Sequence, residues 1–418
     1  MRLFPFAAAL NRALWAIMCA GGLIAASPKW AGPALAAEVV QYFPDGTQPP
    51  EAESGWRLNY EILRPNTHGY GGSAVLVFTG VEFMRGYKPP GEQDWIRILN
   101  NLVLVEMYVP YNDGTEIFDI TGYSFDLVPA SAAYLPPSGI IRGAVQPDGV
   151  VIAEVVDENV RWMDNAIGGD GTRNKVRRGQ SLELWATLSA SNYRYVLRYG
   201  FADDGSIRVR AGGTAANLRS VPAGEHAGVH VHMPAWRMEF DLGAASANRV
   251  DVVEREYDPA RPAADVTHRA VTAETGVVWN AEKFTTLKVT STQSMNRHEP
   301  PLNIAYKIVP MRSGSTRTYR DFTKFDFWIS RRDPATEPRA TAAPELRFVD
   351  VPDNISNPEP VEGQPVVIWH HAAVHHIPRT EDFGRVGWSA RDGVAINHWT
   401  GFDLMPHNFW DKTPLFKR

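Results

Sequence analysis

The chain has 418 residues, of which 44% are hydrophobic and 11% aromatic, and this length is enough to bury a large core. Charged residues make up 21% of the chain and the formal net charge is −5, a balance that argues against a nucleic-acid-binding surface and against a disordered chain. The 31 prolines and 34 glycines are spread along the sequence, as they are where turns join many short strands.

Residues 1–36 have the pattern of a secretory signal. Arg2 and Arg12 supply positive charge, residues 13–26 are mainly apolar, and Ala34-Leu35-Ala36 offers small residues for cleavage. The alternative is a membrane anchor, but the apolar run is short for a span of ~20 residues. We therefore expect an exported protein, periplasmic or extracellular, that is not inserted in a membrane after the signal is removed.

The only cysteine, Cys19, lies inside this signal. Lipid attachment there is disfavoured, because Met18 precedes it where a small residue is needed. The mature chain then has no thiol and no disulfide. This excludes cysteine nucleophiles, thiolate metal sites and Fe–S clusters.

The elements expected after the signal are almost all strands. Residues 37–72 are Pro-rich and without a clear period, and we expect them to be a lead-in to one domain at 73–418. Residues 203–206 form a Gly-containing hairpin turn, and 331–346 form an exposed loop. The expected strands are 74–78, 102–105, 196–202, 207–210, 236–242, 284–289, 325–329 and 366–370. Long amphipathic helices are scarce, so the sequence predicts an all-β fold, a large antiparallel β-sandwich.

Two groups stand out among the twelve histidines. His230 and His232 lie in a β-favouring stretch, where residues i and i+2 point to the same face with Cα atoms roughly 6–7 Å apart. Downstream, residues 370–376 contain four histidines. Without thiols, an all-imidazole site suits Cu(II) or Zn(II), and copper has the higher affinity. The histidines alone leave open whether they bind a metal, line a surface loop or lie in the core.

Six segments in a fixed order favour metal binding over the other two roles for these histidines. They are 108–113 (YVPYND), 118–123 (FDITGY), 191–195 (SNYRY), 230–232 (HVH) followed by 237–241 (RMEFD), 376–382 (HIPRTED) and 406–410 (PHNFW). Their order and spacing resemble the catalytic domain of the copper- and topaquinone-dependent amine oxidases. That resemblance implies a large β-sandwich, called a supersandwich in this family, and a homodimer.

The resemblance also implies roles for particular residues. His230, His232 and His376 would bind Cu(II), and Tyr193 would be oxidised by copper and O₂ to topaquinone. Asp119 would be the base that takes a proton from the α-carbon of a primary amine. Hydrolysis would release an aldehyde, so the overall reaction would convert a primary amine, O₂ and water to an aldehyde, ammonia and H₂O₂.

Two further residues take roles from the same resemblance. Tyr111 would hydrogen-bond an oxygen of the cofactor, and Asn192 would help to fix its ring. Outside the family register, Tyr111 is an aromatic residue at a strand end, and Asp119 is a turn or cap former. The segment order therefore carries these two assignments.

Arg194 departs from the family pattern, which has a carboxylate directly after the modified tyrosine. Because neighbouring strand residues point to opposite faces, we expect Arg194 to point away from the copper. The departure keeps a second hypothesis open, a copper-binding relative that forms no quinone and acts as a metal-binding or accessory protein. A zinc hydrolase is disfavoured, since no Glu-bearing zinc motif accompanies His230 or His232.

A peripheral Ca(II) site is the last expectation. Glu239 and Asp241 alternate on one strand face, and carboxylates with backbone oxygens suit calcium. The family has a further aspartate four residues before Trp369, where this chain has Pro365. The usual disulfide of the domain is also missing, because the mature chain has no cysteine.

Overall fold

The structure, a computed structural model, describes the greater part of the chain after the signal. The described residues are 36–44, 52–63, 75–85, 95–121, 126–131, 134–135, 142–163, 176–190, 193–215, 229–243, 248–261, 265–311, 314–332, 348–377, 379, 382 and 395–410. Within them nearly all regular structure is β, and α2 (Val351–Asn354) is a single helical turn. None of the helices in these ranges has the length and apolar character needed to cross a membrane.

One sheet has ten strands. In spatial order its path is β1 (Ala36–Phe43), β2 (Ser54–Leu63), β3 (Val75–Arg85), β4 (Trp95–Pro110), β12 (His230–Phe240), β19 (Val366–His371), β18 (Phe327–Arg331) and β15 (Thr275–Val277). Two short strands branch from it: β5 (Glu116–Phe118) pairs with β4, and β20 (Val374–His376) pairs with β12. β12 therefore has neighbours from both ends of the chain.

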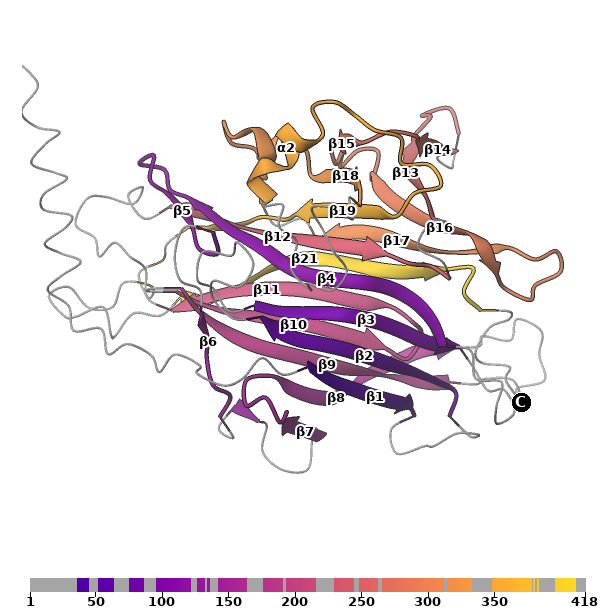
Figure 1. The fold of residues 1–418 in the computed structure, drawn as a ribbon, viewed down its shortest axis with the longest axis horizontal. Coiled ribbons are helices and arrows are strands. Elements are labelled where there is room, and N and C mark those ends of the chain that lie inside the picture. Colours follow the sequence, from indigo (N-terminus) through magenta and orange to yellow (C-terminus); the bar gives the residue numbers. More distant parts are fainter. Residues whose placement is uncertain are drawn as a thin grey trace, which may run out of the picture.

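The other sheet has eleven strands. Its path is β14 (Asp265–Val271), β13 (Asn248–Glu256), β16 (Thr286–Met295), β17 (Asn303–Met311), β21 (Ala395–His407), β11 (Ile207–Ala215), β10 (Tyr193–Ala202), β9 (Val176–Ala190), β8 (Ile152–Met163) and β7 (Arg142–Val145), with β6 (Asp126–Leu127) on β9. The described pairings in both sheets are antiparallel. In Figure 1 the indigo strands β2 and β3 lie over the magenta strands β9 and β10.

The two sheets face each other across an aromatic core. Trp56 of the first sheet lies 5.3 Å from Phe201 of the second, measured between ring centroids. Phe78 and Tyr199 are 4.8 Å apart across the same interface. Large apolar side chains from facing sheets interdigitate in this way in a β-sandwich. The expected all-β antiparallel sandwich is confirmed.

The expected strands all lie within or overlap observed ones, but two begin later than expected: the strand expected at 325–329 begins at Phe327, and the strand expected at 284–289 is also shifted. The strand expected at 284–289 begins only at Thr286, because Phe284 has a φ of 45° and lies about half exposed. A left-handed backbone departs from the extended geometry of a strand. The exposed loop expected at 331–346 falls almost wholly outside the described residues, and Arg331 itself ends β18.

Residues 37–72, which we expected to be a lead-in to the domain, contribute β1 and β2 to the first sheet. β2 has a clear period of two, and its alternate residues Trp56, Leu58, Tyr60 and Ile62 are all fully buried. The surrounding prolines and polar residues hide that period when the segment is read as a whole. The buried side chains of β2 are part of the sandwich core.

The burial of β2 predicts an asymmetric response to truncation. Leu58→Ala removes a fully buried side chain, so it should lower the free energy of unfolding by about 2–5 kcal/mol. Glu61→Ala, on the opposite face of the same strand, should change it by less than about 0.5 kcal/mol. Urea denaturation followed by tryptophan fluorescence measures both. Equal losses for the two variants would contradict the placement of β2 in the core.

Candidate metal centre

Two paired strands bring three histidines together. His230 and His232 lie two residues apart on β12 and point the same way, as the strand period requires. β20 pairs antiparallel with β12, and His376 stands directly opposite His230 in that register. All three side chains are buried, and their ring nitrogens form the one group of potential metal ligands found among the described residues.

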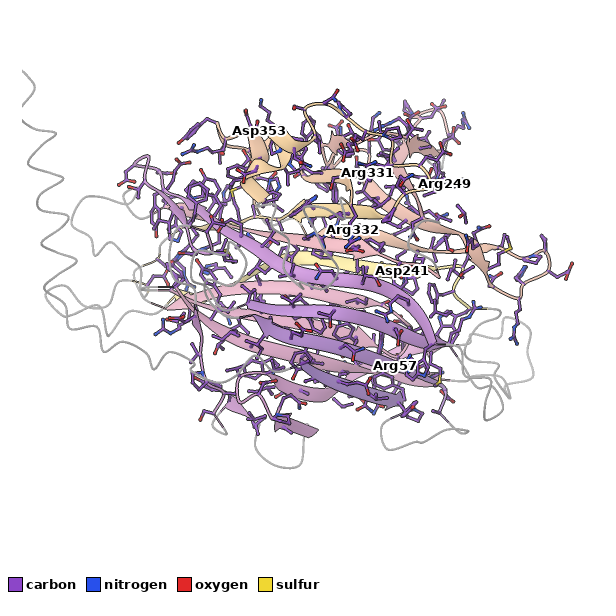
Figure 2. The ribbon with its side chains drawn as sticks, viewed as in Figure 1. Arg57, Asp241, Arg249, Arg331, Arg332 and Asp353 are labelled. Atoms are coloured by element: carbon purple, nitrogen blue, oxygen red, sulfur yellow. The ribbon has the colours of Figure 1, made fainter. Side chains whose placement is uncertain are left out.

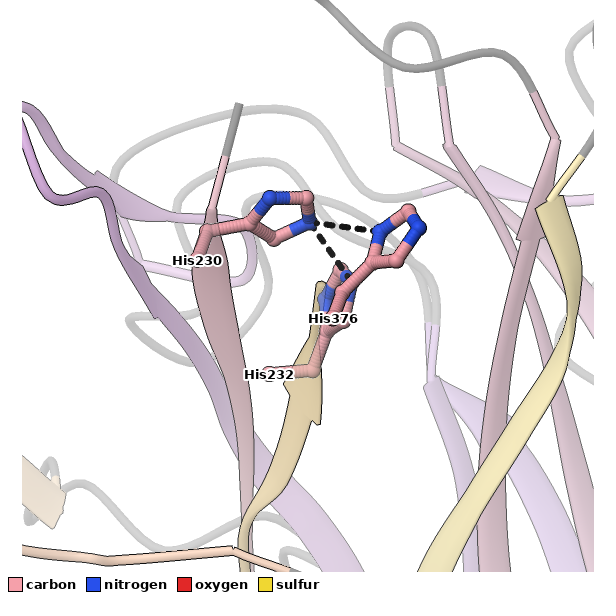
Figure 3. Close-up of side chains that lie close together, drawn as sticks. All are labelled: His230, His232 and His376. Carbon is pink, nitrogen blue, oxygen red and sulfur yellow. Dashed lines mark hydrogen bonds between the residues drawn. The ribbon is translucent and has the colours of Figure 1, made fainter. Parts of the chain in front are cut away.

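The facing nitrogens of the three rings lie within 4.8 Å of one another, and two of the three separations match those around one metal ion. His230 Nε2 lies 3.0 Å from His232 Nε2 and 3.2 Å from His376 Nδ1, and Figure 3 shows the rings converging on that point. Two imidazole nitrogens bonded to one ion at about 2.0–2.1 Å, at angles of about 90–110°, lie about 2.9–3.4 Å apart. The geometry therefore fits a Cu(II) or Zn(II) ion held by three imidazoles.

The protonation of these rings also favours a cation. Burial lowers the pKa of His232 and of His376, so both imidazoles are neutral near pH 7. A neutral imidazole has one N–H and one lone pair. Three nitrogens that face one another at these distances cannot all find hydrogen-bond donors among themselves. A metal ion would give each lone pair a partner.

The remaining nitrogens of two ligands are held from outside the centre. His232 Nδ1 lies 3.0 Å from the hydroxyl of Tyr195, and His376 Nε2 lies 3.2 Å from Asp382 Oδ2. Asp382 in turn accepts hydrogen bonds from the backbone N–H of Arg379, at 2.8 Å, and from its guanidinium. Such outer contacts fix the orientation of metal-binding imidazoles.

Two tyrosines of β10 face the centre, and their hydroxyls reach different atoms. The Tyr193 hydroxyl lies 3.0 Å from His230 Nε2 and 2.6 Å from His376 Nδ1, which are two of the three converging nitrogens. The ring of Tyr195 stacks on that of Tyr193 at 5.8 Å, but its hydroxyl approaches His232 from the outer Nδ1 side. Only the oxygen of Tyr193 is therefore placed to contact the same ion as the histidines.

Arg194 lies between these tyrosines and points to the other face of the sheet. Its guanidinium donates hydrogen bonds to the hydroxyl of Ser189 on the neighbouring strand β9 and to the carbonyl of Tyr193, the latter at 3.2 Å. The strand period thus carries this cation away from the histidines. The expected orientation of Arg194 agrees with the structure.

Asp119 lies beside the centre on the segment that follows β5. Its side chain is 6% exposed and accepts a hydrogen bond of 3.0 Å from the Tyr195 hydroxyl. Burial raises the pKa of the Asp119 carboxyl to about 8, with a smaller contribution from the charge of Glu106, while the hydrogen bond from Tyr195 opposes the rise. A buried carboxyl with a pKa near neutrality has the properties of a general base.

The other residues expected at the site differ in their outcomes. Tyr111 is buried and its ring stacks on that of His230, with centroids 4.5 Å apart. Asn192 lies outside the described residues. Tyr195 had no expected role, although its distance of two residues from Tyr193 on a strand places both side chains on the same face. Asp382 had no expected role either, because only the folded chain brings it against His376.

The expected calcium ligands lie far from the histidines. Glu239 is nine residues from His230 along β12, on the order of 30 Å in an extended strand. Its carboxylate lies 3.2 Å from the guanidinium of Arg332 and 3.6 Å from that of Arg237, and Asp241 is labelled near the right-hand end of the sandwich in Figure 2. Two arginines already compensate the charge of Glu239, so calcium at Glu239 and Asp241 stays a prediction from the resemblance.

Known proteins resemble this chain in sequence and in fold. The chain is 25% identical over 304 residues to histamine oxidase of Arthrobacter globiformis, covering 64% of this chain and 41% of that protein. It is 20% identical over 384 residues to the peroxisomal copper-containing amine oxidase alpha 2 of Arabidopsis thaliana, covering 75% and 53%. The chain thus spans about half the length of these curated relatives, or less.

Solved structures show the same fold. A copper-containing benzylamine oxidase from Hansenula polymorpha superimposes with a TM-score of 0.61 at 14% identity, over 99% of this chain and 84% of that one. A lysyl oxidase of Pichia pastoris gives a TM-score of 0.56 at 17% identity, over 88% and 53%. At these identities the likeness concerns the fold alone.

The family itself follows from the chain's match to a sequence model of one enzyme domain. The model described as "Copper amine oxidase, enzyme domain" matches residues 146–417, well over half of the chain. That range contains Tyr193 and the three converging histidines, whereas Tyr111 and Asp119 lie before it. The chain belongs to the copper amine oxidase family.

Proposed function

We propose that the chain is a primary-amine oxidase that uses Cu(II) and a topaquinone derived from Tyr193. It would convert a primary amine, O₂ and water to an aldehyde, ammonia and H₂O₂. The observation that carries this proposal is the Tyr193 hydroxyl, which lies 3.0 and 2.6 Å from two of three converging imidazole nitrogens. A site that only binds metal needs the imidazoles but not a buried phenol at these distances.

His230, His232 and His376 would hold the copper, and Tyr195 and Asp382 would keep two of these rings in their orientation. When bound, copper and the quinone supply the electron acceptor for the amine and the reaction with O₂. The side chains of the protein hold the reacting groups in position. Its buried site keeps bulk water away from the reacting groups.

Asp119 would take the proton from the α-carbon of the amine. The hydroxyl of Tyr195 donates to one oxygen of its carboxylate, which fixes the carboxylate relative to the neighbouring ring of Tyr193. With a pKa raised to about 8, Asp119 holds the transferred proton more tightly than an ordinary carboxylate would. The stacking of Tyr111 on His230 supports the role of its phenol in orienting the cofactor ring.

The competing function is copper binding without quinone formation, as in an accessory protein. The reason to consider it is Arg194, which stands where the family has a carboxylate. The Arg194 side chain points to the face opposite the histidines, so its positive charge lies outside the metal centre. Arg194 is therefore weak support for copper binding without a quinone. The oxidase is the better-supported proposal, and the two differ in the fate of Tyr193.

Export and dimerisation belong to the proposal as well. Export is supported by the positive, apolar and small-residue succession of residues 1–36. A homodimer is supported by the family resemblance. An exported location would expose the enzyme to extracytoplasmic amines and O₂.

Copper binding is tested by removing one ligand. His232→Ala should lower the bound copper from about one ion per chain to a small fraction of that, since two imidazoles bind a divalent ion much more weakly than three. His375→Ala is the matched control, because the exposed His375 lies beside His376 but bonds the backbone N–H of Ser315. Elemental analysis after copper loading and dialysis measures both. Equal copper in the two variants would refute the assignment.

Quinone formation is tested at Tyr193. Copper-loaded protein incubated in air should bind one equivalent of phenylhydrazine, and the peptide carrying Tyr193 should gain two oxygens and lose two hydrogens by mass. Tyr193→Phe should abolish the adduct but keep the copper, because the three imidazoles remain. An unmodified Tyr193 in copper-loaded wild type, without adduct, would establish the non-catalytic alternative.

The raised pKa of Asp119 predicts how the rate of quinone bleaching by amine depends on pH. Its pKa is raised, so the ionised form that accepts a proton is present above about pH 8 and is lost as the pH falls below it. The rate of quinone bleaching by amine should therefore fall on the acidic side with a midpoint near pH 8. Asp119→Asn should lower this rate by about 10²–10⁴-fold and remove that acidic limb, with the copper and phenylhydrazine titres unchanged. A normal rate in this variant would exclude Asp119 as the base.

A further inference from the structure

We propose that Glu106 is a positioning residue for the base: its buried carboxylate fixes the turn at residues 119–121 and so holds Asp119 against Tyr195. This inference rests on the proposed function, because it concerns the residue assigned there as the proton acceptor. Neither the family segments nor the metal centre assigns a role to Glu106. It touches the turn and not the substrate or the cofactor.

The carboxylate of Glu106 receives three hydrogen bonds, and two of them come from that turn. Its Oε1 accepts the backbone N–H of Ile120 at 3.0 Å and that of Met107 at 2.9 Å, while its Oε2 accepts the hydroxyl of Thr121. Glu106 is 0% exposed, so water does not compete for these donors. Burial raises the pKa of Glu106, and the hydrogen bonds from Thr121, Ile120 and Met107 oppose that rise. Buried hydrogen bonds of this kind hold the backbone firmly.

A β-bulge in β4 sets the direction of the Glu106 side chain toward the turn. Opposite Ala235 and Trp236 of β12, the pairing partners on β4 are Glu106 and Leu104, so Val105 is an extra residue. Such a β-bulge redirects the side chains that follow it. The chain then turns back through β5, and the N–H of Asp119 bonds the carbonyl of Met107 at 3.0 Å.

Asp119 is therefore held from both ends. Its backbone is attached to Met107, and the next two residues are attached to Glu106, whereas its carboxylate is attached to Tyr195. The carboxylate has little freedom left once these contacts form. The nearby charge of Glu106 also helps to raise the pKa of Asp119, after the larger effect of burial.

A second carboxylate in the chain provides a natural comparison. Asp148 is buried and accepts two backbone N–H groups, those of Val150 and Val151, and the hydroxyl of Tyr60. The set of donors is the same as at Glu106, but the turn that it holds leads into β8 and carries no residue of the metal centre. Asp148 thus separates a general structural loss from a loss of base position.

The substitutions are Glu106→Ala, Glu106→Gln and, as control, Asp148→Ala. Each is loaded with copper and incubated in air. One portion is titrated with phenylhydrazine, and a separate portion is mixed with benzylamine in a stopped flow to measure the rate of quinone bleaching. Glu106→Ala should keep the copper and phenylhydrazine titres but lower the bleaching rate by about 10²-fold, the loss expected when a reacting group moves by about 1 Å. Asp148→Ala should bleach within about twofold of wild type.

Glu106→Gln should restore the rate to within about tenfold of wild type. Its amide oxygen still accepts the two N–H groups, and its NH₂ can donate to the Thr121 hydroxyl. A wild-type bleaching rate in Glu106→Ala, or an equal loss in Asp148→Ala, would overturn the proposal. So would a Gln variant as slow as the Ala variant, since geometry would then not be what Glu106 supplies.

Hydrogen exchange separates this proposal from the function on which it rests. If wild-type protein forms no phenylhydrazine adduct, the proposed oxidase fails, and the bleaching rate carries no information on Glu106. The Ile120 amide still reports the contact: it should lose protection in Glu106→Ala and keep it in Asp148→Ala, as seen by deuterium uptake in a peptide covering 116–121. Unchanged protection in Glu106→Ala would overturn the positioning role whether or not the quinone forms.

Discussion

The pairing of β12 with β20 is the interaction on which the rest of the centre depends. His230 and His232 are brought to one face by the strand period alone, but the third imidazole comes from 144 residues beyond His232 and arrives only because β20 adds to the same strand. Burial lowers the pKa of His232 and of His376, so both of these rings are neutral near pH 7 and turn a lone pair toward the centre. The fold supplies a site whose polar atoms are best satisfied by a cation.

The same period of two organises the opposite sheet. On β10, Tyr193 and Tyr195 face the histidines and Arg194 faces away, so the one departure from the family pattern at this strand is kept out of the centre. The two phenol hydroxyls contact different atoms. Tyr193 reaches the inner nitrogens, and Tyr195 joins the outer nitrogen of His232 to the carboxylate of Asp119.

Local periodicity could be read from the sequence, and long-range pairing could not. The faces of His230, His232 and Arg194 follow from alternation, and the order of segments singled out His376 among four nearby histidines. β1 and β2 were missed because prolines and polar residues mask the alternation of Trp56, Leu58 and Tyr60. The contacts of Asp382 with His376 and of Glu106 with Thr121 depend on a turn and on a bulge in β4, which have no signature in the order of residues.

The buried state of Asp119 bears on the choice between oxidase and metal-binding protein. Its pKa is about 8 in the folded chain against 3.8 for an ordinary aspartate, so unfolding releases a proton between these values and the fold loses stability as the pH rises through them. Copper binding by three imidazoles does not require this loss of stability. Among its described hydrogen bonds, the Asp119 carboxylate contacts Tyr195 and no imidazole. A carboxyl kept buried, held by Tyr195 and approached by the charge of Glu106, is useful to a protein that must move a proton. The destabilised carboxyl therefore favours catalysis over simple metal storage.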